Sequence, residues 1–447
     1  MSKKINFTNA IKTFLGLFLF LLPWQTIWIY KEVITNKGKW EFFTLGFYAS
    51  ELFLWFTATI FIFWFYKKIK QKNKKINFSF TKDRLFVLSC VLFILYILAA
   101  SFWSIDSDLA IQQFLRVSAV LILFLMLFIG PLKVVRQMQF FVVGSVIPVF
   151  LGIFQFLTQS TFSNKWLGLV EHPVWQAGSS IVSGPNIGRW LRSYGTFNHP
   201  NIFGGYLVLA ILFTSILFLW TKKKLNKCLL LAIYLVQATA LFFSFSRSAW
   251  ISFFLMQILV IFVYYKNAGL KKYIPLASSV FLLFLIIVSF NFNLVSTRLA
   301  ADSVTEIRAI NERVEGYRTG ESIFKDKSIF GVGPGNYTLA LVFNNLYNSS
   351  LKPWEFQPVH NVFYLILAEL GLVGIVLLLL VVAGYLNVIM STEKDRWGRV
   401  FIIFFMFLSI MPIAMFDHYL WTSFPGMIML SVYLAILSRL TPQVLHK

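Results

Sequence analysis

Apolar stretches of about 20 residues recur along the whole chain, and each is long enough for an α-helix to cross the hydrocarbon core of a bilayer. This feature predicts an all-α, polytopic integral membrane protein with about 12 transmembrane helices. We expect residues 1–447 to form a single membrane domain. The predicted spans are 11–30, 44–66, 85–103, 113–130, 138–158, 201–220, 228–245, 249–265, 273–292, 361–390, 400–416 and 424–440.

The composition agrees with a membrane protein. The chain has 447 residues, of which 58% are hydrophobic and 13% charged, an apolar share above that of soluble domains. The formal net charge is +22, but the basic residues form short runs between the apolar stretches. Such runs are topology signals rather than a nucleic-acid-binding surface, so we expect the lipid bilayer, and no nucleic acid, as a partner.

Lysine and arginine clusters mark every second connection between the predicted spans. Because cytoplasmic connections carry the excess of basic residues, both termini are predicted to be cytoplasmic. The two long connections, 159–200 and 293–360, then lie on the extracytoplasmic side, as does a minor exception to the rule formed by Lys31, Lys37 and Lys39. The basic clusters lie within 67–84, 133–136, 222–227, 266–272 and 394–399.

The two cysteines and the N-terminus complete this description. Cys90 and Cys228 fall in apolar stretches, so we expect free, buried thiols. His, Cys, Asp and Glu residues show no metal-ligand spacing, and neither a metal nor a cofactor is expected. The N-terminal apolar run lacks a convincing cleavage site, which predicts an uncleaved first span.

The large extracytoplasmic connection is predicted to carry an amphipathic helix over 305–328. Its charged residues flank a stripe of apolar ones, so the helix should lie on the outer face with the apolar side down. A turn-rich segment, 330–337, follows and leads toward His360. The apolar stripe consists of Ile307, Ile310, Val314, Tyr317 and Phe324.

Two polar clusters adjoin predicted spans on the same face. In 244–248, Arg247 stands between two spans, where an arginine is paired, hydrated or functional, and a snorkelling interfacial arginine is the alternative. In 192–201, Gly and Pro favour a turn, and a helix N-cap is the alternative to substrate binding. The candidate substrate-binding residues of this second cluster are Arg192, Asn198, His199 and Asn201.

The predicted outer helix adds Arg308, Arg313 and Arg318. Guanidinium groups bind phosphate oxygens bidentately and keep their charge, which makes these residues candidates for substrate binding. Pairing along the helix is the alternative. It is expected for Arg308 with Glu312, and less so for Arg313 at the edge of the apolar stripe.

His360 and Asn361 stand at the start of the span 361–390. Histidine titrates near neutral pH and can accept a proton from a hydroxyl, so His360 is a candidate general base and Asn361 a candidate substrate contact. An interfacial histidine satisfied by a neighbour is the alternative. Asp417 and His418 form a similar pair in a later outer connection and could orient another group or cap a helix.

Together these segments resemble the O-antigen ligase and polymerase family of bacterial membrane glycosyltransferases. The resemblance covers residues near 190–375 and depends on the order, sidedness and spacing of the motifs. One departure is Tyr317, where many family members carry Trp. The matching motifs are Gly195–Asn201, Ser246–Ser248, Arg313 with Tyr317, Gly331–Tyr337, and His360–Asn361 with Tyr364, Glu369 and Gly371.

The resemblance implies a glycan donor on a polyprenyl diphosphate, normally undecaprenyl diphosphate. It implies that His360 is the base and that Arg247 and Arg313 are essential arginines. The acceptor stays open among a lipid A-core, a growing glycan, a protein and another cell-wall polymer. A lipid-glycan flippase, a protein O-oligosaccharyltransferase and a non-catalytic scaffold are the alternatives, although the chain lacks the internal repeat that many transporters show.

Overall fold

The computed structural model describes residues 7–35, 38–70, 84–185, 187–268, 270–300, 303–343, 356–390 and 396–440. The structure is 74% helical. Two short 3₁₀ helices are η1 (Glu41–Phe43) and η2 (Leu270–Lys272). The α-helices are α1 (Phe7–Leu21), α2 (Ala49–Lys70), α3 (Arg84–Ala100), α4 (Ser107–Ile129), α5 (Val134–Gly144), α6 (Val146–Thr158), α7 (Pro200–Trp220), α8 (Lys224–Phe243), α9 (Arg247–Ala268), α10 (Ile274–Phe290), α11 (Phe292–Ala300), α12 (Val304–Asp326), α13 (Tyr337–Phe343), α14 (Val362–Met390), α15 (Arg396–Phe416), α16 (Tyr419–Thr422) and α17 (Phe424–Arg439).

Six helical segments in the described part of the chain are long and apolar enough to cross a membrane. The pair α10 and α11, bent by 92°, makes a seventh if it forms one span. Shorter apolar helices occupy the positions of the remaining predicted spans, so the number of about 12 stays a prediction. The six segments are α2, α4, the continuous pair α5 and α6, α7, α8 and α14.

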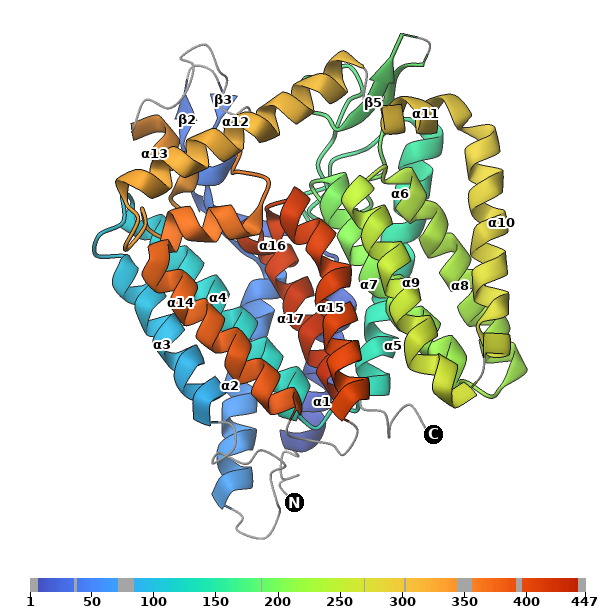
Figure 1. The fold of residues 1–447 in the computed structure, drawn as a ribbon, viewed down its shortest axis with the longest axis horizontal. Helices are drawn as coiled ribbons and strands as arrows, with labels where there is room; N and C mark the ends of the chain where they lie inside the picture. The colour runs from blue at the N-terminus through green and yellow to red at the C-terminus, as the bar shows by residue number, and fades with distance from the viewer. Residues whose placement is uncertain are drawn as a thin grey trace.

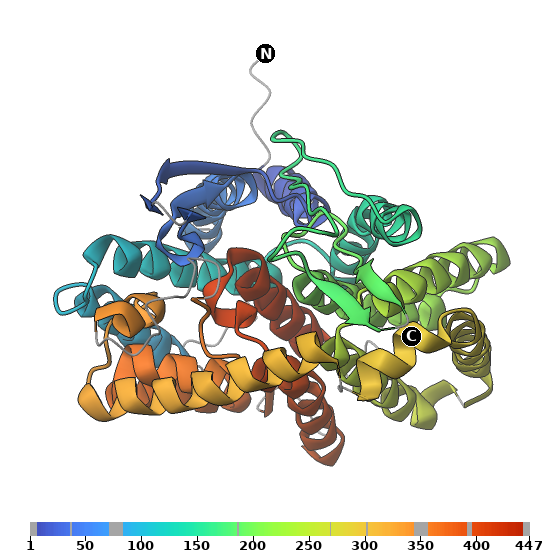
Figure 2. The ribbon, with the colours of Figure 1, turned by 90° about the horizontal axis from the view of Figure 1, so that it is seen from above.

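The long helices run roughly side by side, and α12 lies across one end of the bundle (Figure 1). Seen from that end, α12 extends from above α14 toward α11 (Figure 2). Helix α7 is the central element, because its apolar residues are buried on all sides by neighbours that include α5, α8 and α9. Helix α1 begins and α17 ends at the end opposite α12 (Figure 1).

Among the described residues, three small antiparallel sheets, which an all-α prediction omits, lie at the α12 end. The first predicted span is wrong beyond Leu21, because Pro23 lies two residues after the end of the helix and the chain then becomes strand β1 (Ile27–Lys31). The pairs are β1 with β4 (Leu45–Tyr48), β2 (Ile34–Thr35) with β3 (Gly38–Lys39), and β5 (Ile181–Gly184) with β6 (Gly188–Leu191).

Helix α14 contains a break that receives the turn-rich segment 330–337. Gly371 has a φ of 63°, and the amide of Leu372 donates to Ser328 instead of continuing the helix. In return, the amides of Val332 and Gly333 donate to carbonyls of α14, at 3.1 and 2.9 Å. The Glu369 carboxylate accepts from the Gly335 amide at 2.8 Å and from the Trp421 indole at 2.7 Å. The turn is therefore built into the broken helix and linked to α16.

The helix predicted over 305–328 is confirmed as α12, but the orientation of its stripe is wrong in its first half. Ile307, Ile310 and Val314 are 48%, 40% and 46% exposed. The physical reason is that the buried Glu306 points inward instead, to an arginine partner. The apolar contact with the bundle begins later, at the half-buried Tyr317, and continues at the buried Ile323.

The cysteine prediction is partly confirmed. Cys90 and Cys228 are free thiols, but Cys90 is only half-buried, and Cys228 is exposed near the start of α8. Several predicted features lie outside the described residues. They are the basic connection over 71–83, Lys37, Lys394 and residues 344–355 of the second long connection.

Candidate active site

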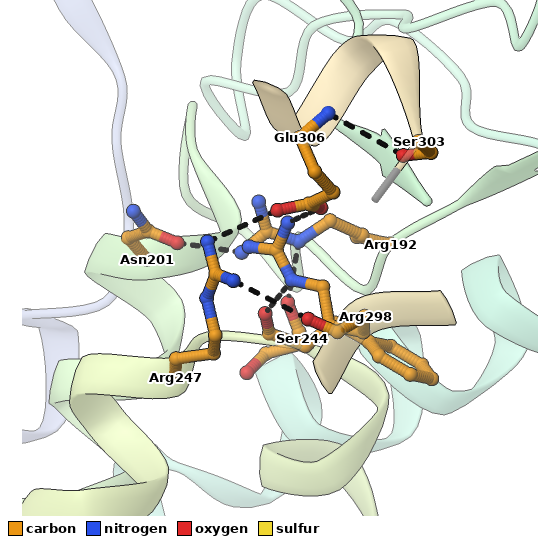
Figure 3. A network of polar contacts seen from close by, with 8 residues as sticks. Arg192, Asn201, Ser244, Arg247, Arg298, Ser303 and Glu306 are labelled. Carbon is orange, nitrogen blue, oxygen red and sulfur yellow. Dashed lines mark hydrogen bonds and ion pairs between the residues drawn. The ribbon is translucent and has the colours of Figure 1, made fainter. Parts of the chain in front are cut away.

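The turn between α8 and α9 is the base of the site. Phe245 has a φ of 47°, an uncommon conformation for a residue with a bulky side chain. The carbonyl of Ser244 accepts from Nε of Arg192 at 2.7 Å, and that of Phe245 accepts from Nε of Arg298 at 3.0 Å. The strained turn thus directs two consecutive carbonyls to two buried arginines (Figure 3).

Glu306 joins the first turn of α12 to this base. Its Oε1 forms an ion pair with Nη1 of Arg298, and its Oε2 lies 3.0 Å from Nη2 of Arg247 (Figure 3). The Ser303 hydroxyl caps α12 by accepting from the Glu306 amide at 3.4 Å. A carboxylate buried between two guanidinium groups is compensated by charge, as a buried ion must be.

A second polar chain starts at Arg192. Its Nη2 donates to Oδ1 of Asn201 at 2.5 Å, and the side-chain amide nitrogen of Asn201 donates to Oδ1 of Asp417 at 2.8 Å. The Ser248 hydroxyl donates to the other Asp417 oxygen at 2.8 Å. Burial raises the pKa of Asp417, while these two hydrogen bonds act against that shift. The chain links the starts of α7 and α9 to the α15–α16 connection.

His360 lies beside this network. Its ring is 5.0 Å from that of His418, in an edge-to-face arrangement, and Nδ1 of His418 is 2.8 Å from the Thr422 hydroxyl. Burial, and then the charge of Arg313, lower the pKa of His360 to about 4. The imidazole is therefore neutral at neutral pH, and its unprotonated ring nitrogen can accept a proton.

Tyr317 fixes α12 above His360. The Asn361 amide donates to the Tyr317 hydroxyl at 3.3 Å, and the Tyr317 ring packs edge-on against Tyr364 at 5.2 Å. Oδ1 of Asn361 accepts from the amides of Phe363 and Tyr364, at 2.9 and 3.1 Å, and so caps α14. This arrangement keeps Arg313, one helical turn before Tyr317, near the imidazole.

Several predicted site residues converge, and others do not. Arg192, Asn201 and Arg247 join the buried network, while the charge of Arg313 acts on both His360 and Asp417. His199 caps α7, as the alternative interpretation expected, because its Nδ1 accepts from the backbone amide of Asn201 at 3.1 Å. Its Nε2 lies 3.0 Å from the Ser180 hydroxyl.

The remaining candidates lie on the surface. Arg308 pairs with Glu312 at 2.8 Å, as the alternative interpretation of that arginine expected. Arg318 lies 3.5 Å from Glu315, and both of these side chains are exposed. Asn198 is exposed as well. These three residues are less well placed for a buried substrate group than Arg247 and Arg313.

Arg298 and Glu306 are absent from the predicted site. Arg298 follows an apolar stretch and has the pattern of an interfacial arginine, and Glu306 has the pattern of a surface helix charge. Their separation is not a helical contact spacing, so no periodicity indicates that they pair. The sequence indicates Asp417 only as part of the polar pair Asp417–His418. It does not indicate the hydrogen-bond partners of Asp417, because they come from segments far away in the sequence.

The site combines guanidinium groups with a neutral imidazole on one face of the bundle. Such a set can hold an anion and accept a proton from a hydroxyl beside it. Over the part of the chain that the structure describes, no group of three or more His, Cys, Asp and Glu side chains is arranged to hold a metal.

Part of the chain is similar to a known protein family. Residues 232–379 match the O-antigen ligase family. The match begins within α8, ends within α14, and includes Arg247, Arg313 and His360. No curated protein matches the chain. The motifs, the apolar helices and this match together make the chain similar to the membrane proteins of the O-antigen ligase family, whose members act as glycosyl-transferring enzymes in polysaccharide biosynthesis.

Proposed function

We propose that the protein transfers a glycan from undecaprenyl diphosphate to an acceptor hydroxyl on the outer face of the bacterial cytoplasmic membrane. The observation that carries this proposal is the neutral imidazole of His360 within the field of Arg313, next to the network that contains Arg247. The family match supports glycosyl transfer from a lipid-linked donor.

The arginines act on the leaving group. Negative charge grows on the diphosphate as the bond to the anomeric carbon breaks, so cations placed there stabilise the transition state more than the ground state. Arg247 and Arg313 belong to different helices, α9 and α12, and can contact the diphosphate from two directions. Arg192 supports them from below, because its guanidinium donates to Ser244 and Asn201.

His360 acts on the acceptor. In the free protein its pKa is low, first because it is buried and second because Arg313 is nearby. A bound diphosphate offsets the charge of Arg313 and therefore raises the affinity of the imidazole for a proton. His360 becomes a stronger base when the donor is in place, which couples deprotonation of the acceptor hydroxyl to donor binding.

The reaction then follows from the leaving group. The acceptor oxygen attacks the anomeric carbon, the bond to the diphosphate breaks, and His360 takes the hydroxyl proton. One direct displacement inverts the anomeric configuration. Because a diphosphate is a good leaving group that the arginines stabilise, we propose that this step proceeds without a metal ion and without a covalent enzyme intermediate.

A transfer assay tests this proposal. The purified chain is reconstituted in nanodiscs with an undecaprenyl-diphosphate oligosaccharide and is offered a lipid A-core, a second donor molecule or a protein as the acceptor. We expect an elongated or ligated product and free undecaprenyl diphosphate in equal amounts. The acceptor that reacts distinguishes ligase, polymerase and protein-modifying activities.

Arginine variants distinguish catalysis from a scaffold role. Arg313→Lys retains the charge but loses the planar fork, and should reduce transfer by about 10²-fold, the scale of one charge-stabilising donor. The control is Arg189→Lys on β6, an exposed outer arginine that donates to the carbonyls of Val174 and Gln176. Movement of the intact lipid-linked glycan across the membrane without product would instead support a flippase.

A further inference from the structure

The two carboxylate oxygens of Glu306 have unlike surroundings. Oε1 is bound to Arg298, which is buried and also donates to the Phe245 carbonyl. Oε2 lies 3.0 Å from Nη2 of Arg247, yet it is a buried oxygen without a hydrogen bond among the described residues. Glu306 is therefore held firmly by one arginine and only by charge by the other.

Arg247 is the more accessible of these two arginines. Its side chain is 27% exposed, whereas that of Arg298 is 10% exposed and that of Glu306 is 3% exposed. Nη1 of Arg247 donates to the Arg298 carbonyl at 3.3 Å, which holds the guanidinium in place when its other nitrogens change partner. An anion that enters from the outer face meets Arg247 with its Nη2 directed at the carboxylate of Glu306.

We propose that Glu306 is a built-in competitor for the donor diphosphate at Arg247. In the resting protein its Oε2 is paired with the guanidinium of Arg247. The incoming diphosphate takes the place of Oε2 in that ion pair, while Oε1 stays paired with Arg298. When transfer has formed undecaprenyl diphosphate in the site, the carboxylate returns to Arg247 and helps to displace this product. Glu306 is thus a positioning residue that acts through Arg247, and this inference rests on the proposed function.

The physical argument concerns like charges in a poorly hydrated place. A carboxylate a few ångströms from a bound diphosphate repels it, and burial strengthens that repulsion relative to water. Release of the product depends on such a repulsion, because the same arginines that stabilise the leaving diphosphate would otherwise retain it. Glu306 therefore weakens ground-state binding of the diphosphate and speeds its release.

Glu306→Gln tests the proposal. The variant removes the charge and nearly preserves the shape, so undecaprenyl diphosphate should bind about tenfold more tightly than to the wild type. Steady-state transfer should fall because the product leaves more slowly. The control Glu321→Gln makes the same charge change on an exposed part of α12, where Glu321 pairs with Lys325, and should change neither quantity.

Two further measurements separate this role from a structural one. In Glu306→Gln with Arg247→Ala, the gain in affinity should disappear. Glu306→Gln leaves Arg298 without its counterion and should melt at a lower temperature, but added undecaprenyl diphosphate should raise its melting temperature more than that of the wild type. A purely structural role predicts weaker binding together with the lower melting temperature.

The outcomes distinguish this inference from the proposed function. Equal or weaker binding of undecaprenyl diphosphate by Glu306→Gln, with an active wild type that binds the lipid, overturns the inference alone. Absence of binding and transfer in the wild type overturns the proposed function and this inference with it. If Glu306→Gln cannot be purified, Glu306→Asp, whose carboxylate is drawn back from Arg247, should bind the lipid more tightly than the wild type, and weaker binding overturns the proposal.

Discussion

At the scale of single residues, the chemistry depends on side chains whose neighbours change their properties. His360 is neutral because it is buried and faces the charge of Arg313. Asp417 is buried and receives hydrogen bonds from Asn201 and Ser248. The residues that set these properties come from separate helices, so each role belongs to the group rather than to one side chain.

Removal of the proposed base gives the first prediction. His360→Ala should reduce transfer by about 10²–10⁴-fold, the usual contribution of a general base. The variant should remain in the membrane with a melting temperature close to that of the wild type. Initial rates in the nanodisc assay check this expectation, and a well-folded His360→Ala protein with the wild-type rate contradicts the role.

The pH dependence gives the second prediction. The pKa of His360 is lowered from 6.5 to about 4, so its imidazole can accept a proton at any pH above that value. The acid limb of log kcat/KM, which reports the free enzyme, should therefore fall near pH 4 and not near 6.5. Arg313→Gln removes the second cause of the lowered pKa and should move the acid limb of the residual activity to higher pH. A limb near 6.5 in both proteins would exclude this coupling.

At the scale of elements, the site depends on breaks in regular structure. The α8–α9 turn directs two carbonyls to arginines, and the break in α14 receives the segment 330–337. Helix α12 is held at both ends of the site, by Glu306 at its start and by Tyr317 in its middle. These irregular points position the helices that carry the functional side chains.

The break in α14 gives the third prediction. A Cβ at Gly371 would lie 2.6 Å from the Gly331 amide nitrogen and would contact the Ile329 carbonyl, besides having an unfavourable φ of 63°. Gly188 has the same φ, but a Cβ there meets nothing within 4 Å. Gly188→Ala should lower stability by about 1–2 kcal/mol, and Gly371→Ala by clearly more. Thermal unfolding in detergent checks this, and equal losses would show that the break is adaptable.

Helices were predictable to the extent that their signals are local. The length of an apolar stretch and the period of 305–328 are properties of one segment, so those helices were found. Most of strand β1 falls inside the predicted span 11–30, because its residues are mostly as apolar as those of a membrane-spanning helix. The pair of Arg298 and Glu306 was not found, because contact between two segments leaves no periodic pattern in a single sequence.

At the scale of the whole molecule, the proposed reaction requires that the donor diphosphate, the arginines and His360 lie on one side of the membrane. The α8–α9 turn, the start of α14 and α12 meet at the same end of the bundle (Figure 1). The basic connections predict that the opposite end is cytoplasmic. This topology predicts that a donor that reaches the site presents its diphosphate at the extracytoplasmic surface.

Cysteine labelling gives the fourth prediction, which concerns this sidedness. In a protein with Cys90 and Cys228 replaced by Ser, Glu312→Cys on α12 should react with a membrane-impermeable maleimide in intact spheroplasts. Lys224→Cys at the start of α8 should react only after permeabilisation. The reverse pattern would place the site in the cytoplasm.

The most direct measurement is the structure of the purified protein with an undecaprenyl-diphosphate glycan, determined by electron cryo-microscopy. The diphosphate should lie between Arg247 and Arg313, with the anomeric carbon of the first sugar facing His360. Density for the diphosphate at a position away from both arginines, or at the end of the bundle opposite α12, would contradict the proposed enzyme.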